Sequence, residues 1–125
     1  MTSKAERRRF PRREYQVAAI VERKKTLVGG RVLNISEEGL ALEVPESFDA
    51  GDEVGIEFLP PGSQSLANLR GVVCYVNHIT QTSKKGGRES FYWVGIQFLD
   101  VPLMVREQIK NYALGGNPLS LVSHS

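Results

Sequence analysis

The sequence predicts an all-β fold, in which a small antiparallel β-barrel carries one C-terminal α-helix and a flexible N-terminal arm. Short segments with apolar residues at alternate positions recur between polar, glycine-containing turns, as is typical of antiparallel barrels. This alternation gives way to a helical period only near the C-terminus. The chain has 125 residues, of which 41% are hydrophobic, and this suits a single domain with one core.

The first strands follow the N-terminal arm. The segment 15–23 (YQVAAIVER) is rich in β-branched and apolar residues, and the next turn is expected at the glycine pair 29–30. Strands are then expected at 31–36 (RVLNIS) and 39–44 (GLALEV), with Gly39 at the bend between them.

Three further strands complete the sheet. They are expected at 53–58, 69–76 and 91–99, where apolar side chains again alternate with polar ones. The polar segment 81–90 (QTSKKGGRES) predicts a long mobile hairpin loop before the last strand. Cys74 is expected to be a small buried side chain of its strand.

The final ordered element is expected to be an amphipathic helix. Val105, Ile109 and Tyr112 lie at positions i, i+4 and i+7, so they share one face. Asp100 is expected to cap this helix, and Gly115 is expected to end it.

These elements predict three regions of the chain. Residues 1–14 form a flexible basic arm, residues 15–114 form the barrel with its closing helix, and residues 115–125 form a loose tail.

Positive charge is concentrated in the arm. Residues 1–13 contain six Lys or Arg and one Glu, for a net charge of +5, whereas the whole chain is only +2, so the remaining residues sum to −3. A nucleic-acid-binding domain usually spreads its positive charge over a face or groove. The arm is therefore expected to bind a compact anion, and no nucleic-acid partner is expected.

The composition argues against several classes of protein. One cysteine and two histidines exclude an intrachain disulfide and disfavour a structural zinc site. The sequence contains no H-E-x-x-H, G-x-x-x-x-G-K-[ST] or G-x-S-x-G motif, so a catalytic function is not expected. With no apolar run of about 18 residues and no signal-peptide pattern, we expect a cytoplasmic protein without a membrane span.

The arm suits binding of a nucleotide. Pro11 disfavours a helix, so Arg8 and Arg12 can converge on one anion from an extended segment. Arginine forms bidentate hydrogen bonds with phosphate and also stacks on flat rings such as purines.

The segment NISEEG, residues 34–39, offers a second group of polar contacts. Asn34 supplies amide donors and an acceptor, Ser36 supplies a hydroxyl, and Gly39 allows close approach of the backbone. Without other information, Asn34 and Ser36 would more often be turn residues that bond their own backbone.

The pair RRFPR (8–12) and NISEEG (34–39) resembles the RxxxR and [D/N]xSxxG motifs of the PilZ domain family. The segment YWVGIQF (92–98) and the closing helix are also similar to that family, and the resemblance covers roughly residues 6–114. It implies a six-stranded antiparallel β-barrel and a bacterial receptor for the second messenger cyclic di-GMP (c-di-GMP), with no other cofactor.

The resemblance also implies roles for individual residues. Arg8 and Arg12 are expected to bind the phosphates and guanine faces, Asn34 and Ser36 a guanine edge, and Gly39 is expected to shape the turn.

Three further residues are weaker candidates. Arg7 matches a family position at which arginine favours a stacked pair of ligands over a single one. Arg9 either adds a phosphate contact or is solvated. Trp93 is out of phase with Val94 and Ile96, so it is expected to face away from the core, where it either contacts ligand or packs against the helix.

The proposed mechanism is that ligand orders the arm against the barrel and so changes a surface that an unidentified partner protein reads. Two alternatives remain open. One is a barrel that binds single-stranded nucleic acid or another polyanion, and the other is a PilZ-fold interaction domain that binds no ligand.

Overall fold

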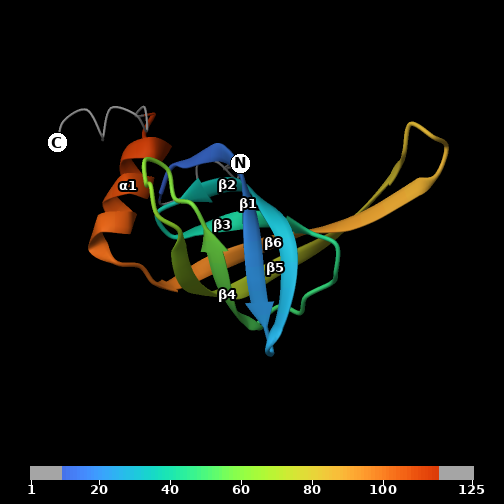
Figure 1. Cartoon of the computed structure of the whole chain (residues 1–125), viewed down its shortest axis with the longest axis horizontal. Coiled ribbons are helices and arrows are strands. Elements are labelled where there is room, and N and C mark those ends of the chain that lie inside the picture. The colour runs from blue at the N-terminus through green and yellow to red at the C-terminus, as the bar shows by residue number, and fades with distance from the viewer. Residues whose placement is uncertain (1–9, 116–125) are drawn as a thin grey trace, which may run out of the picture.

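The computed structural model describes residues 10–115, which fold into six β-strands and one α-helix (Figure 1). The predicted antiparallel all-β fold with one C-terminal helix is confirmed. The elements are β1 (Arg12–Arg23), β2 (Thr26–Ser36), β3 (Gly39–Val44), β4 (Glu53–Phe58), β5 (Ala67–Thr82), β6 (Arg88–Asp100) and α1 (Leu103–Ala113).

The six strands pair in the order β1-β2-β3-β6-β5-β4, and β1 also pairs with β4, so the sheet closes on itself. Every neighbouring pair is antiparallel. Side chains that point to the inside of this closed sheet form the core. The largest fully buried ones include Phe58, Ile35, Leu40, Leu42, Ile56 and Leu69.

The turn between β1 and β2 differs from the prediction. It lies at Lys24 and Lys25, which have φ angles of 49° and 66°, and not at the glycine pair 29–30. Arg23 pairs with Thr26, so this is a two-residue hairpin, whose favoured turn needs positive φ at both central residues. Gly30 lies inside β2, where a Cβ would come within 2.5 Å of the Glu43 carbonyl oxygen on β3.

Strand β1 begins earlier than predicted. Arg12 pairs with Ser36 at the end of β2, so residues 12–14 of the segment predicted as a flexible arm belong to the sheet. Most of the predicted arm, residues 1–9, and the predicted tail after Gly115 lie outside the described residues.

The predicted long loop at 81–90 is also largely strand. β5 continues to Thr82 and β6 starts at Arg88, and these two residues pair across the hairpin. The tip is closed by Ser83, whose N–H bonds to the Gly87 carbonyl at 2.7 Å. Figure 1 shows the resulting two-stranded ribbon, the far parts of β5 and β6, projecting well beyond the rest of the sheet.

The expectation for Cys74 is wrong, because its side chain is exposed. The pairing of β5 with β6 shifts by one residue between Val73 and Tyr75, which is the signature of a β-bulge at Cys74. Before the bulge, Leu69 and Val73 point inward, and after it Val76 packs against the core. The extra residue therefore changes which positions of β5 face the interior.

Helix α1 packs through the predicted apolar face, with Ile109 fully buried and Tyr112 partly buried against the core. Its N-cap is Pro102 and makes no side-chain capping bond, so the expected cap at Asp100, which lies in β6, is wrong. Gly115, with φ 101°, follows the end of the helix as predicted.

Three consecutive residues of β1 hold α1 through Tyr112. The Arg13 guanidinium lies 4.3 Å from the centre of the Tyr112 ring and also donates to the Tyr112 carbonyl at 3.1 Å. The Tyr112 hydroxyl donates to the Glu14 carbonyl oxygen, and the Tyr15 ring meets the Tyr112 ring edge-on, with centroids 5.1 Å apart.

The surroundings of Tyr15 predict that the folded protein loses stability in alkali. Partial burial and the nearby Tyr112 raise the pKa of Tyr15 from 10.0 to about 12, and its hydroxyl donates to the Leu59 carbonyl at 2.6 Å. Because the folded pKa is raised, the neutral phenol contributes stability that is present below pH 10 and lost between pH 10 and about 12. We expect Tyr15→Phe to flatten the fall of the thermal midpoint over this window. If the thermal midpoint falls with pH equally steeply in the variant and the wild type, this expectation is contradicted.

Candidate functional site

The two sequence motifs meet at a hydrogen bond between β1 and β2. Arg12 Nη1 donates to Asn34 Oδ1 at 2.8 Å, and both side chains are partly buried. Arg12, at the start of β1, lies opposite Ser36 on β2. Asn34 is two residues before Ser36 on the same strand, so the Arg12 side chain can reach it. The structure thus brings together one residue of each predicted motif.

Arg12 and Asn34 border a hollow of about 450 Å³ on the outside of the sheet. Asn34 on β2 pairs with Ala41 on β3, and both residues line this hollow. The methyl side chain of Ala41 occupies little of this space. Its other lining residues are Arg13, Glu14, Gln16, Leu33, Tyr75 and Trp93.

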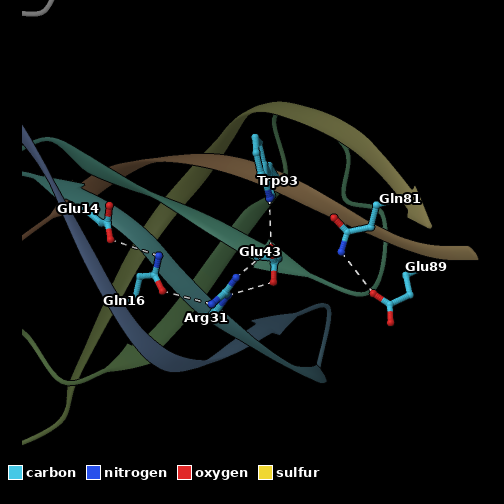
Figure 2. Close-up of polar contacts among 7 residues, drawn as sticks. All are labelled: Glu14, Gln16, Arg31, Glu43, Gln81, Glu89 and Trp93. Carbon is cyan, nitrogen blue, oxygen red and sulfur yellow. Dashed lines mark hydrogen bonds and ion pairs between the residues drawn. The ribbon is translucent and has the colours of Figure 1, made fainter. Parts of the chain in front are cut away.

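Trp93 faces away from the core, as predicted, and its side chain is 41% exposed. Its indole Nε1 donates to Glu43 Oε1 at 3.3 Å, and Arg31 Nε donates to the other oxygen of that carboxylate at 3.0 Å. Arg31 is in turn bonded to Gln16, so a chain of polar contacts across β1, β2, β3 and β6 holds the ring in place (Figure 2).

Tyr75 is a candidate site residue that sequence reasoning missed. Its ring is 45% exposed and lies directly over Gly95, where a Cβ would come within 1.9 Å of Tyr75 Cε2. Tyr75 is the first residue after the β-bulge, and the bulge decides which face it occupies. A regular alternation along β5 does not indicate that Tyr75 faces the hollow.

A second hollow, of about 230 Å³, adjoins the first. Arg12 and Tyr75 line both, and Gly39, Cys74 and Gln97 are among the residues that line only the second. A cation and an aromatic ring therefore stand between two adjacent spaces, an arrangement that suits a ligand with separate anionic and flat parts.

Ser36 and Gly39 shape the turn between β2 and β3. Ser36 is 1% exposed, and its hydroxyl donates to the Gly39 carbonyl at 3.4 Å and accepts from the Glu38 N–H at 3.3 Å. At Gly39 a Cβ would lie 2.0 Å from the Ile96 carbonyl oxygen, so a side chain here conflicts with the backbone of β6. A ligand contact of Ser36 stays a prediction.

The remaining candidates, Arg7, Arg8 and Arg9, lie outside the described residues. Within residues 10–115, no helix is long and apolar enough to cross a membrane. In the same part of the chain, no three His, Cys, Asp or Glu side chains gather in a way that could hold a metal ion.

Known structures share this architecture. The PilZ domain of YcgR from Escherichia coli, solved with c-di-GMP, superposes with a TM-score of 0.67 at 15% identity, covering 94% of this chain and 97% of that one. The K. pneumonia MrkH–c-di-GMP complex gives a TM-score of 0.65 at 22% identity, covering 94% of this chain and 54% of that one. The Bacillus subtilis inhibitor of motility MotI gives 0.65 at 13% identity, covering 100% of this chain and 59% of that one.

These likenesses establish the fold. The chain spans little more than half the length of MrkH and MotI, whereas it matches nearly the whole PilZ domain of YcgR. Among curated proteins, none matches this chain by sequence. The sequence profile of the PilZ domain matches residues 6–115, which is most of the chain. The chain therefore belongs to the PilZ domain family.

Proposed function

We propose that this domain is a c-di-GMP receptor, and not an enzyme, that binds its ligand in the hollow beside Arg12. The observation that carries the proposal is the Arg12 guanidinium held on Asn34 at the edge of a space that two half-exposed aromatic rings, Tyr75 and Trp93, also line. Membership of the PilZ family supports it, and YcgR and MrkH are related folds that were solved with this ligand.

The chemistry of the hollow matches the parts of a cyclic dinucleotide. A guanidinium forms strong paired hydrogen bonds with phosphate oxygens, and a planar base stacks on aromatic or guanidinium faces. In the proposed complex Arg12 binds phosphate, Asn34 presents its amide to a guanine edge, and Tyr75 or Trp93 stacks on a base. Ser36 and Gly39 keep the β2–β3 turn in the shape that positions Asn34.

The N-terminal arginines complete the proposed site. Arg8 supplies a second guanidinium four residues before Arg12, while Arg7 and Arg9 add charge beside it. Arg7 favours a stacked pair of ligands, and the two adjacent hollows that share Arg12 and Tyr75 offer space for more than one base. Binding then draws the arginine segment onto the sheet, which alters the surface available to a partner protein.

Calorimetric titration with c-di-GMP, GTP and a short single-stranded oligonucleotide tests this function. We expect selective binding of c-di-GMP, with a stoichiometry that distinguishes one ligand from a stacked pair. Asn34→Ala is expected to weaken c-di-GMP binding by about tenfold, since it removes a directed hydrogen bond. Preference for the oligonucleotide, with affinity unaffected by Asn34→Ala and falling steeply with salt, would instead establish a polyanion-binding arm.

A further inference from the structure

Strand β5 extends far beyond the strand that covers its outer edge. β4 pairs only with residues Ala67–Val72 of β5. From Cys74 to Thr82, β5 pairs with β6 alone within the described residues 10–115. This part of β5 forms one side of the projecting ribbon in Figure 1, so it presents a long strand edge to solvent. Backbone N–H and C=O groups along such an edge are available to another strand.

The sequence along this edge does not protect it. Residues 74–82 (CYVNHITQT) contain no charged residue, no proline and no glycine, and four of the nine are β-branched. Folded proteins usually block an open edge with lysine, proline or a short strand. The end of the neighbouring strand β6, beyond the residues that pair with β3, does carry charge, at Arg88 and Glu89.

We propose that this β5 edge binds a second copy of the chain by antiparallel pairing of residues 74–82 about a two-fold axis at His78. An uncharged segment can lie against its own copy without the repulsion that like charges produce across strands. Each copy contributes the same edge once, so the assembly closes as a dimer and does not grow into a fibre. This pairing of two copies does not require c-di-GMP.

The charges beyond the two ends of the segment are complementary in this register. Pairing about His78 places Thr82 opposite Cys74 of the second copy, so the ribbon tip reaches the point where β4 begins. The tip carries three cations, Lys84, Lys85 and Arg88, and one acid, Glu89, so it is basic on balance.

The structure around the other end of the edge is acidic. The loop before β4 lies directly beside β5, because the Val73 N–H donates to the Asp52 carbonyl at 2.9 Å and the Gly51 N–H donates to the Val73 carbonyl at 2.8 Å. Glu46, Asp49, Asp52 and Glu53 belong to this loop or to the first residue of β4. Asp52 and Glu53 are already ion-paired with Arg23 and Arg70, so Glu46 and Asp49 are the acids that would meet the second copy. The basic tip of each copy therefore meets an acidic loop of the other, twice per dimer.

Sedimentation equilibrium of the whole chain without ligand provides the first test. We expect a reversible dimer, and we expect Thr80→Lys to raise its dissociation constant by about tenfold or more, since it puts charge into the paired segment of both copies. Ala18→Lys, at an exposed position of β1, is the matched control and should leave dimerisation unchanged. A monomer at all concentrations, or a dimer that tolerates Thr80→Lys, overturns the proposal.

Charge reversal tests the register. Lys84→Glu with Lys85→Glu should weaken the dimer, and adding Glu46→Lys with Asp49→Lys to the same chain should restore it. In a Cys74→Ser background, His78→Cys should form a disulfide-linked dimer on mild oxidation, whereas Ala18→Cys and the wild-type chain should not. A dimer that shows neither the charge rescue nor the His78→Cys cross-link uses another surface.

Discussion

Replacing Arg12 with alanine is expected to lower the affinity for c-di-GMP by about a hundredfold or more. Hydrogen bonds to charged groups are each worth roughly 1.5–3 kcal/mol, and a bidentate guanidinium–phosphate contact contains two of them. Arg12 also lines both hollows, so its loss affects the phosphate contact and the wall between the two spaces together. Calorimetric titration of purified wild-type and variant proteins measures the change directly.

The control for this experiment is Arg70→Ala. It removes the same charge from an exposed position on β5, where Arg70 is paired with Glu53, and it should leave c-di-GMP affinity unchanged. The Arg12–Asn34 hydrogen bond is expected to contribute only about 1 kcal/mol to folding, so the thermal midpoint of Arg12→Ala should fall by no more than a few degrees. Normal binding by Arg12→Ala would exclude the proposed site.

Gly39→Ala is expected to lower the stability of the folded protein strongly. The new Cβ would lie 2.0 Å from the Ile96 carbonyl oxygen, so β3 and β6 must separate locally although they pair at this position. Such overpacking against backbone is expected to cost about 3 kcal/mol, or roughly 10 °C in the thermal midpoint. Ligand affinity should fall as a consequence, since the β2–β3 turn that positions Asn34 is distorted.

Gly29→Ala is the matched control, because it makes the same chemical change in β2 where no atom lies within 4 Å of the new Cβ. Its thermal midpoint should stay close to that of the wild type, measured by the same thermal scan. If Gly39→Ala is as stable as Gly29→Ala but fails to bind, Gly39 acts by contacting ligand and not by admitting the backbone of β6.

Local patterns predicted the strands well where pairing is regular. Leu40 and Leu42 alternate in β3 and are fully buried, and the helical spacing of Ile109 and Tyr112 matches the packed face of α1. The turn before β2 was misplaced because glycine was taken as the turn signal, whereas Lys24 and Lys25 adopt positive φ in the tight hairpin. Strand pairing there outweighs local preference.

The candidate site was predictable only in part. Residues Arg12 and Asn34 were found through their motifs, and the structure places them in contact. Tyr75 was missed because its direction depends on a bulge in the pairing of β5 with β6, which no local pattern in β5 reveals. The polar residues of the ribbon predict a loop, because a two-stranded ribbon outside the core needs no apolar alternation. Its strands nevertheless stay paired as far as Thr82 and Arg88.

The start of β1 connects the proposed ligand site with the helix. Arg12 faces Asn34, while the next three residues hold Tyr112 of α1, so one continuous stretch of backbone serves both contacts. Thermodynamic linkage then couples ligand binding to helix docking. The free energy that ligand binding contributes to fixing this stretch also favours the docked helix, and undocking of the helix lowers the ligand affinity by the same factor. A partner that captures α1 would thereby act as an antagonist of the proposed ligand without approaching the ligand's site.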